Sequence, residues 1–200
     1  MGRMAGTLTE EIAAAAARLV VEDGMEYGPA KRRAAKLVGR HARDADLPDN
    51  ERLEDEVRAY LALFCADTQP RELAALRAIA ITWMERLAAF RPHLTGAVWR
   101  GTATRHSDIY LDLFCDDSKS AELALIDKRI DYEVSSKPGP RREPIDVLTL
   151  MSRCAELDQR VAVHLNVLDY DDLRGALKAD GRGRPMRGDL TALRAVEASA

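Results

Sequence analysis

Hydrophobic residues in the first ninety positions recur at steps of three and four, which is the spacing of amphipathic helices. The first run covers Glu11 to Val21, and Gly24 follows it as a helix terminator. Thr7 and Glu10 stand three positions apart just before this run, which is the spacing of a capping box. A first helix is therefore well defined.

Three more helices are predicted in the same half of the chain. Gly28 and Pro29 open the second, which is expected to close at Gly39. Thr68 and Pro70 open the fourth, after a polar link and a third helix. The third and fourth helices each show one apolar stripe. The stripe of the third helix consists of Leu53, Val57, Tyr60, Leu61 and Phe64. The stripe of the fourth helix consists of Leu73, Leu76, Ile79, Trp83, Leu87 and Phe90.

The pattern changes after Pro92. Two short runs with strand composition, at 95–99 and 109–114, flank a turn-rich segment at 101–107. The remaining expected elements are helices at 118–128, 169–177 and 189–196, strands at 132–134, 145–151 and 161–168, and a hairpin loop at 135–143. This order predicts an α+β protein, in which an N-terminal helical region of about four helices is followed by a mixed β-sheet flanked by helices. The expected domains are a helical N-terminal region at residues 1–68 and an α+β domain at residues 69–200.

Composition places the chain among ordinary globular proteins. It has 200 residues, of which 46% are hydrophobic and 32% charged, and a formal net charge of -3. The three cysteines Cys65, Cys115 and Cys154 are too few and too far apart for a disulfide framework or a CxxC metal site. No apolar run approaches the ~18 residues of a membrane span, and no signal peptide is recognisable. We therefore expect a cytoplasmic protein with no membrane partner.

The main chemical signal lies between Gly96 and Leu111. Gly96-Ala97 is followed, after ten residues, by Asp108-Ile109-Tyr110. This segment resembles the signature of the nucleotidyltransferase superfamily, the fold of DNA polymerase beta and of minimal bacterial nucleotidyltransferases. In that family Gly-Ser precedes Asp-hydrophobic-Asp by about the same distance. The resemblance implies a nucleotidyltransferase-like sheet and a nucleotide site formed by Gly96, Arg100, Gly101, Thr102, Thr104 and Arg105.

The family's chemistry needs two carboxylates at alternate strand positions, which face one side and hold a pair of Mg²⁺ ions. Tyr110 occupies the second of these positions, and its neutral phenol is a poor Mg²⁺ ligand. Ala97 replaces the serine, and Asp112 would lie roughly 13 Å from Asp108 along an extended strand. The candidate catalytic residues are therefore Asp108, which is also the candidate metal ligand, and Asp146 and His164.

For Asp108 and His164, a purely structural role is the alternative to a catalytic one. Asp108 also suits a turn cap at the start of a strand, and His164 a hydrogen-bonded histidine of a half-buried strand. The motif thus leaves open whether the protein is an enzyme.

Three functional hypotheses follow. The first is a degenerate nucleotidyltransferase-like module without catalysis, which binds a nucleotide, another phosphorylated small molecule or a protein partner. The second is an active nucleotidyltransferase with a rearranged metal site, which would use Mg²⁺ and a nucleoside triphosphate. The third and weaker one is nucleic-acid binding through the loop from Arg182 to Arg187 and a basic stretch that acidic residues flank. That stretch contains Lys31, Arg32, Arg33, Lys36, Arg40, His41 and Arg43.

Overall fold

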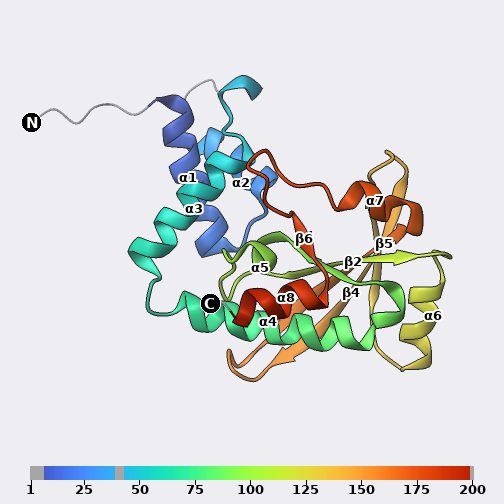
Figure 1. Ribbon diagram of the computed structural model, residues 1–200. Coiled ribbons are helices and arrows are strands. Elements are labelled where there is room, and N and C mark those ends of the chain that lie inside the picture. Colours follow the sequence, from blue (N-terminus) through green and yellow to red (C-terminus); the bar gives the residue numbers. More distant parts are fainter. Residues whose placement is uncertain (1–6, 39–42, 199–200) are drawn as a thin grey trace, which may run out of the picture. The chain divides into compact units, whose positions relative to one another are not determined.

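A computed structural model describes residues 7–38 and 43–198 of the chain (Figure 1). The chain divides into two compact units. The N-terminal unit contains Met1–Pro70 and Thr102–Ser107, and the sheet unit contains Arg71–Gly101 and Asp108–Ala200. The predicted helix end at Gly39 and two of the predicted basic residues, Arg40 and His41, lie outside the described residues.

The N-terminal unit is built from three helices that pack together (Figure 1). Thr7 and Glu10 form the predicted capping box, and Gly24 ends the first helix with a φ of 66°. A Cβ atom at Gly24 would lie 2.1 Å from the carbonyl oxygen of His106, so only glycine fits this turn. The helices are α1 (Leu8–Asp23), α2 (Tyr27–Leu37) and α3 (Asn50–Phe64), with a 3-10 turn at Asp44–Asp46. Their core consists of Ile12, Ala16, Ala17, Val20, Val21, Ala30, Ala34, Leu53, Val57 and Leu61.

The loop Thr102–Ser107 belongs to the N-terminal unit, although it interrupts the chain of the sheet unit. Thr104 Oγ1 donates to the carbonyl oxygen of Val21 at 3.2 Å, and Gln69 Nε2 donates to the carbonyl oxygen of Ala103 at 2.9 Å. These bonds satisfy backbone groups at the end of α1 and inside the loop. The sequence prediction places this loop with the C-terminal residues instead.

The sheet unit contains a six-stranded mixed sheet in the order β3-β4-β5-β2-β1-β6. Only β2 and β5 run parallel, and every other pair of neighbours is antiparallel. The strands are β1 (His93–Thr95), β2 (Ile109–Cys115), β3 (Glu133–Pro138), β4 (Pro144–Cys154), β5 (Gln159–Asp169) and β6 (Arg187–Gly188). The helices are α4 (Gln69–Arg86), α5 (Gly96–Arg100), α6 (Ser120–Asp127), α7 (Leu173–Ala176) and α8 (Leu190–Ala198), with 3-10 turns at Ala88–Phe90 and Tyr170–Asp172. The predicted α+β class, with helices flanking a mixed sheet, is confirmed.

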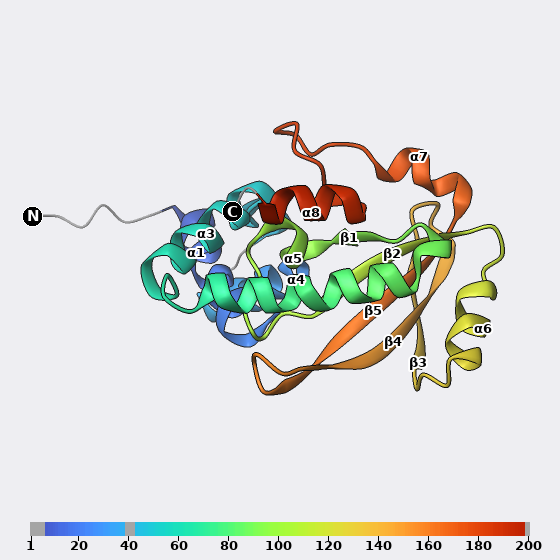
Figure 2. The ribbon, with the colours of Figure 1, turned by 60° about the horizontal axis from the view of Figure 1, so that its bottom comes forward.

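One face of the sheet is apolar and lies against α4, with α8 beside that helix (Figure 2). Trp83 Nε1 of α4 donates to Ser152 Oγ of β4 at 3.1 Å, and Arg194 of α8 forms an ion pair with Glu85 of α4. The buried side chains on this face are Leu94, Ile109, Leu111, Leu113, Leu148, Leu150, Val163 and Leu165. Their period of two along each strand leaves the alternate positions for the opposite face.

Three of the predicted elements between Thr95 and Leu177 differ from those of the structure. The expected strand at 95–99 is wrong, because the backbone turns at Gly96, whose φ is 73°, and continues as α5. The expected loop at 135–143 is shorter, because pairing with β4 extends β3 to Pro138. The expected helix at 169–177 is a 3-10 turn followed by the single turn of α7.

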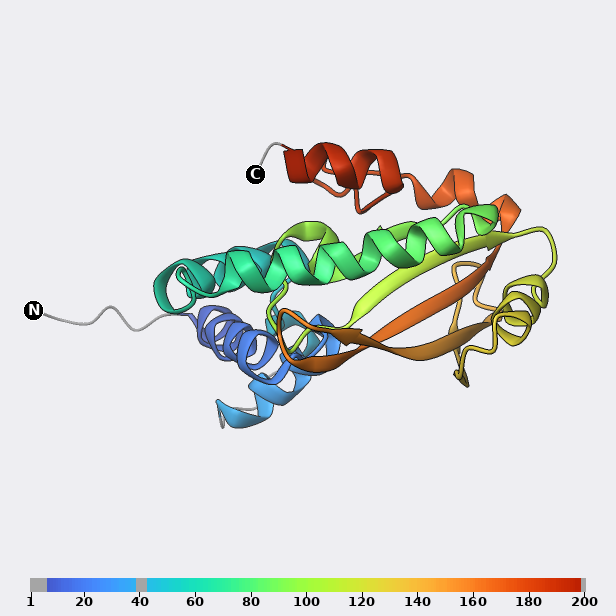
Figure 3. The same cartoon turned by 90° about the horizontal axis from the view of Figure 1, so that it is seen from below.

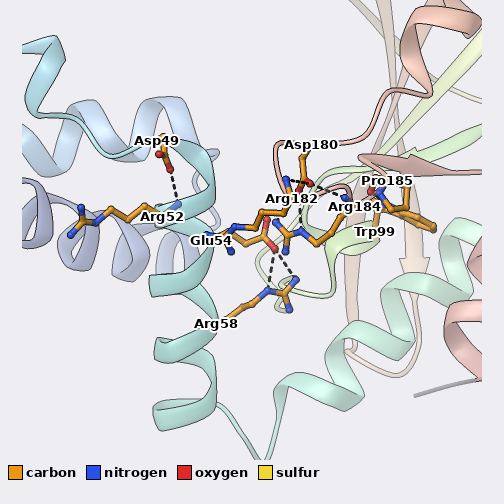
Figure 4. Close-up of polar contacts among 9 residues, drawn as sticks. All are labelled: Asp49, Arg52, Glu54, Arg58, Trp99, Asp180, Arg182, Arg184 and Pro185. Atoms are coloured by element: carbon orange, nitrogen blue, oxygen red, sulfur yellow. Dashed lines mark hydrogen bonds and ion pairs between the residues drawn. The ribbon is translucent and has the colours of Figure 1, made fainter.

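The glycine- and arginine-rich segment before β6 is held by Asp180 (Figure 4). Its carboxylate accepts from the backbone N–H groups of Arg182 and Arg184 and from Arg184 Nε, at 2.8 to 2.9 Å. The bonds from Arg184 hold the pKa of Asp180 below its usual range. Trp99 Nε1 donates to the carbonyl oxygen of Pro185 at 2.8 Å, which ties the segment to α5.

Two contacts of α3 appear in the same view (Figure 4). Asp49 caps the helix by accepting from the backbone N–H of Arg52 at 2.7 Å, and Arg58 pairs with the buried carboxylate of Glu54 at 2.8 Å.

Among the described helices, none combines the length and apolarity that crossing a bilayer would require.

Candidate functional site

The face of the sheet opposite α4 carries a polar side chain from each strand at one level. Strand pairing aligns these residues across the sheet, and alternation puts them on the same face. We call this set the polar row, and from β6 to β3 it consists of Arg187, Thr95, Tyr110, His164, Thr149 and Glu133. Alternation places Asp108, Asp112 and Asn166 on the same face.

His164 is the centre of a hydrogen-bonded chain. Its Nε2 lies 3.1 Å from Asp108 Oδ2, and its Nδ1 lies 2.9 Å from Thr149 Oγ1. A carboxylate only accepts hydrogen bonds, so Nε2 donates to Asp108, and Nδ1 shares the second hydrogen bond with the Thr149 hydroxyl, which can donate or accept. The side chain of His164 is 20% exposed and that of Asp108 44% exposed. The two hydrogen bonds thus orient the imidazole of His164, and the Asp108 side chain remains accessible to solvent.

Tyr110 stacks on this histidine. The ring centroids are 4.7 Å apart, with 21° between the ring planes. A Cβ atom at Gly96 would lie 3.5 Å from the Tyr110 ring, so the glycine leaves that edge of the ring uncovered by a side chain. Lys137 Nζ lies 6.0 Å from the ring centroid. Tyr110 therefore has both a hydrogen-bonded histidine and a cation near its ring.

Asp112 has a different role from Asp108. Its Oδ1 accepts from Asn166 Nδ2 at 2.6 Å, and its Oδ2 forms an ion pair with Arg187 Nη1. The Asp112 side chain is only 7% exposed. Both carboxylate oxygens are therefore used within the protein, and Asp112 serves as a structural counterion.

Two atoms of this buried cluster have no hydrogen-bond partner among the described residues. They are Asn166 Oδ1 and Arg187 Nε, an acceptor and a donor that flank the same aspartate. Buried polar atoms in folded proteins nearly always have a partner. A water molecule or a polar group of a ligand would satisfy them.

The residues on this face do not fit a pair of Mg²⁺ ions, which need several oxygen ligands in octahedral geometry. Asp108 shares one oxygen with His164, Tyr110 offers a neutral phenol, and both oxygens of Asp112 are taken. Asp146 lies on the opposite face and bonds Lys119 Nζ at 3.4 Å. No group of three or more acidic, histidine or cysteine side chains in the described part of the chain could hold a metal ion. The structure therefore does not bring Asp146 to Asp108, as a rearranged metal site would require.

The family resemblance rests on the segment from Gly96 to Leu111. Comparisons with protein-family models, curated proteins and solved structures found no match. The family therefore stays a prediction, and the polar row carries the functional argument.

The predicted nucleotide-binding residues are divided between the two units. Gly96 lies beside the Tyr110 ring, and Arg100 and Gly101 form the end of α5. Thr102, Thr104 and Arg105 belong to the N-terminal unit, where the hydroxyl of Thr104 is bonded to a backbone carbonyl and Thr102 is buried. The two buried threonines are therefore not available to a nucleotide in this structure.

A separate pocket of about 270 Å³ lies where β2 and β5 end. Its only basic side chain, among the described residues that line it, is Arg141, whose Nε donates to Asp172 at 2.8 Å. The acidic side chains around it are Asp116, Glu143, Asp146, Asp169 and Asp172. An excess of carboxylates repels phosphate, so this pocket is a poor candidate for a nucleotide site.

The basic stretch of α2 is partly engaged inside the N-terminal unit. Lys31 Nζ donates to the carbonyl oxygen of Pro48 at 3.0 Å and to Asn50 Oδ1 at 2.9 Å. Arg33 Nη1 lies 3.8 Å from a carboxylate oxygen of Asp23. The bonds of Lys31 hold its ammonium group against neutral oxygens within the unit, and the carboxylate of Asp23 partly offsets the charge of Arg33.

Proposed function

We propose that this protein binds a nucleotide or another phosphorylated small molecule on the polar row, without a metal ion and without nucleotidyl transfer. The observation that carries the proposal is the stack of Tyr110 on His164, with Asp108 hydrogen-bonded to the same histidine. Tyr110 thus stands where the family signature has its second carboxylate, and Asp108, at the place of the first carboxylate, is hydrogen-bonded to an imidazole. The proposed site is thus a ligand-binding version of the family's catalytic site.

The chemistry of the row suits a nucleotide. A nucleobase stacks on aromatic rings, and its polar edge needs donors and acceptors. Tyr110 and His164 supply the aromatic surface, and the half-exposed carboxylate of Asp108 supplies an acceptor. Lys137 supplies a cation on the same face, which is where a phosphate group would be attracted.

An active enzyme is the second candidate, and one observation favours it. His164 Nε2 and Asp108 Oδ2 lie 3.1 Å apart, so two polar groups able to handle a proton meet at the motif. A transferase using them would attach a labelled nucleotidyl group from a triphosphate to an acceptor and release pyrophosphate, and would lose this activity in His164→Ala. Absence of label transfer, with nucleotide binding intact, would favour the binding module.

The proposal is tested by calorimetric titration of ATP into the wild type and into Tyr110→Ala, with adenosine and pyrophosphate as partial ligands. We expect Tyr110→Ala to weaken ATP binding about tenfold, because stacking on one aromatic residue contributes about 1–3 kcal/mol per base. Tyr170→Ala is the matched control, since this exposed tyrosine contacts Arg91 and lies outside the polar row. Equal losses in both variants, or no ATP binding by the wild type, would refute the proposal.

A further inference from the structure

β3 is an edge strand with an open outer side. All six residues of Glu133–Pro138 are exposed, and the strand pairs with β4 alone among the described strands. An exposed edge presents unpaired N–H and C=O groups to any strand that approaches. Figures 2 and 3 show β3 and α6 together at one end of the sheet.

We propose that a second copy of this chain docks on β3 by antiparallel strand addition, around a two-fold axis at Ser135. Residues directly opposite each other in an antiparallel pair both point their backbone groups at the partner strand, or both point them away. When a strand pairs with its own copy, opposite residues must therefore differ by an even number of positions. The two-fold axis must therefore lie midway between the two copies of one residue, which faces its own copy. The candidates near the strand centre are Val134, Ser135 and Ser136.

The charges on β3 select Ser135 from these three. An axis at Ser135 places Glu133 of each copy opposite Lys137 of the other, and the two side chains share a sheet face. An axis at Ser136 leaves Glu133 outside the paired strand and sets Pro138, which has no N–H, opposite Val134. An axis at Val134 pairs only residues 133–135 within the strand. Ser135 alone thus combines an overlap of five strand residues, 133–137, with two complementary ion pairs.

A patch of exposed apolar side chains beside β3 supports the same two-fold contact. Val134 is 54% exposed, and Leu123 and Ile126 of α6 are 56% and 52% exposed. Val134 pairs with Leu148, and therefore points to the same face as Asp146. Lys119 at the start of α6 bonds Asp146 at 3.4 Å, which places α6 on this face as well.

Joining two copies at Ser135 would therefore bring two such patches together across the axis. The paired strands would continue both six-stranded sheets into one. Burial of apolar side chains would then add to the backbone hydrogen bonds of the new strand pair.

A charge-swap experiment tests the register. Sedimentation of the full chain over a wide range of concentration should give a species of twice 22.1 kDa for the wild type. Glu133→Lys and Lys137→Glu should each raise the dimer dissociation constant about 100-fold, because like charges then face each other twice. The double variant restores both pairs and should dimerise as the wild type does. A wild-type monomer at all concentrations, or single variants that dimerise normally, would overturn the proposal.

Cysteine crosslinking gives a second test, which does not depend on charge. In a Cys65→Ser background, Ser135→Cys should form an intermolecular disulfide on mild oxidation, because each residue 135 faces its own copy. Ser136→Cys is the matched control and should stay reduced, since it faces Val134. The remaining cysteines, Cys115 and Cys154, are buried. Equal crosslinking of the two variants would rule out an axis at Ser135.

Discussion

Replacing Asp112 with alanine is expected to lower the unfolding free energy of the sheet unit by about 3 kcal/mol, because it removes the partner of a largely buried arginine. Arg187 is 21% exposed at its side chain, and Asn166 Nδ2 would lose the carboxylate oxygen that accepts its hydrogen bond. Both tryptophans, Trp83 and Trp99, lie in the sheet unit, so urea unfolding followed by tryptophan fluorescence reports on this unit.

Asp116→Ala is the matched control. Its carboxylate is 75% exposed and lies 3.6 Å from Arg91, so its loss should change the unfolding free energy by less than about 1 kcal/mol. The double variant Asp112→Leu with Arg187→Met should recover most of the loss, because no unpaired charge is left buried. A cost for Asp112→Ala as small as that of the control would show that Asp112 is not a structural counterion.

Replacing Tyr110 with aspartate is expected to create a cation site that the wild type lacks. Asp108 and the introduced carboxylate would occupy alternate positions of one strand face, with their α-carbons about 6.6 Å apart. Two carboxylates at that spacing can share a divalent ion, which a carboxylate and a phenol cannot. We expect Mn²⁺ to bind this variant at least about tenfold more tightly than the wild type. The measurement is the loss of the electron paramagnetic resonance signal of free Mn²⁺ on titration with protein.

Tyr110→Asn is the control for this gain. It removes the same stacking contact with His164 and has nearly the size of the aspartate, but it adds no charge. Mn²⁺ affinity should therefore rise in the aspartate variant alone. Equal affinity in the two variants, or tight Mn²⁺ binding by the wild type, would show that Tyr110 is not what prevents metal binding.

Local signals were sufficient for the first helix of the fold. The capping box at Thr7 and the glycine at Gly24 mark the first helix without help from distant residues, and the structure has both. The strand expected at 95–99 was wrong because apolar residues of a short buried helix and of a short strand look alike over five positions. Gly96, with its positive φ, was the signal of the turn.

The polar face of the sheet could be predicted only in part. Asp108 and His164 were both candidates, but their contact spans 56 positions and depends on the parallel pairing of β2 with β5. The ion pair of Asp112 with Arg187 spans 75 positions, and the segment of Arg187 had the composition of a loop. No periodicity within one strand encodes such a partner, because the register between distant strands is set by the packing of the whole sheet.

The magnesium dependence of ATP binding distinguishes a metal-free ligand site from a surviving nucleotidyltransferase. ATP is titrated into the wild type and into Asp108→Ala, once in EDTA and once with excess magnesium. We expect the wild type to bind ATP in EDTA, with an affinity close to that measured with excess magnesium. Binding that requires magnesium and disappears in Asp108→Ala would contradict metal-independent recognition and restore the two-metal hypothesis.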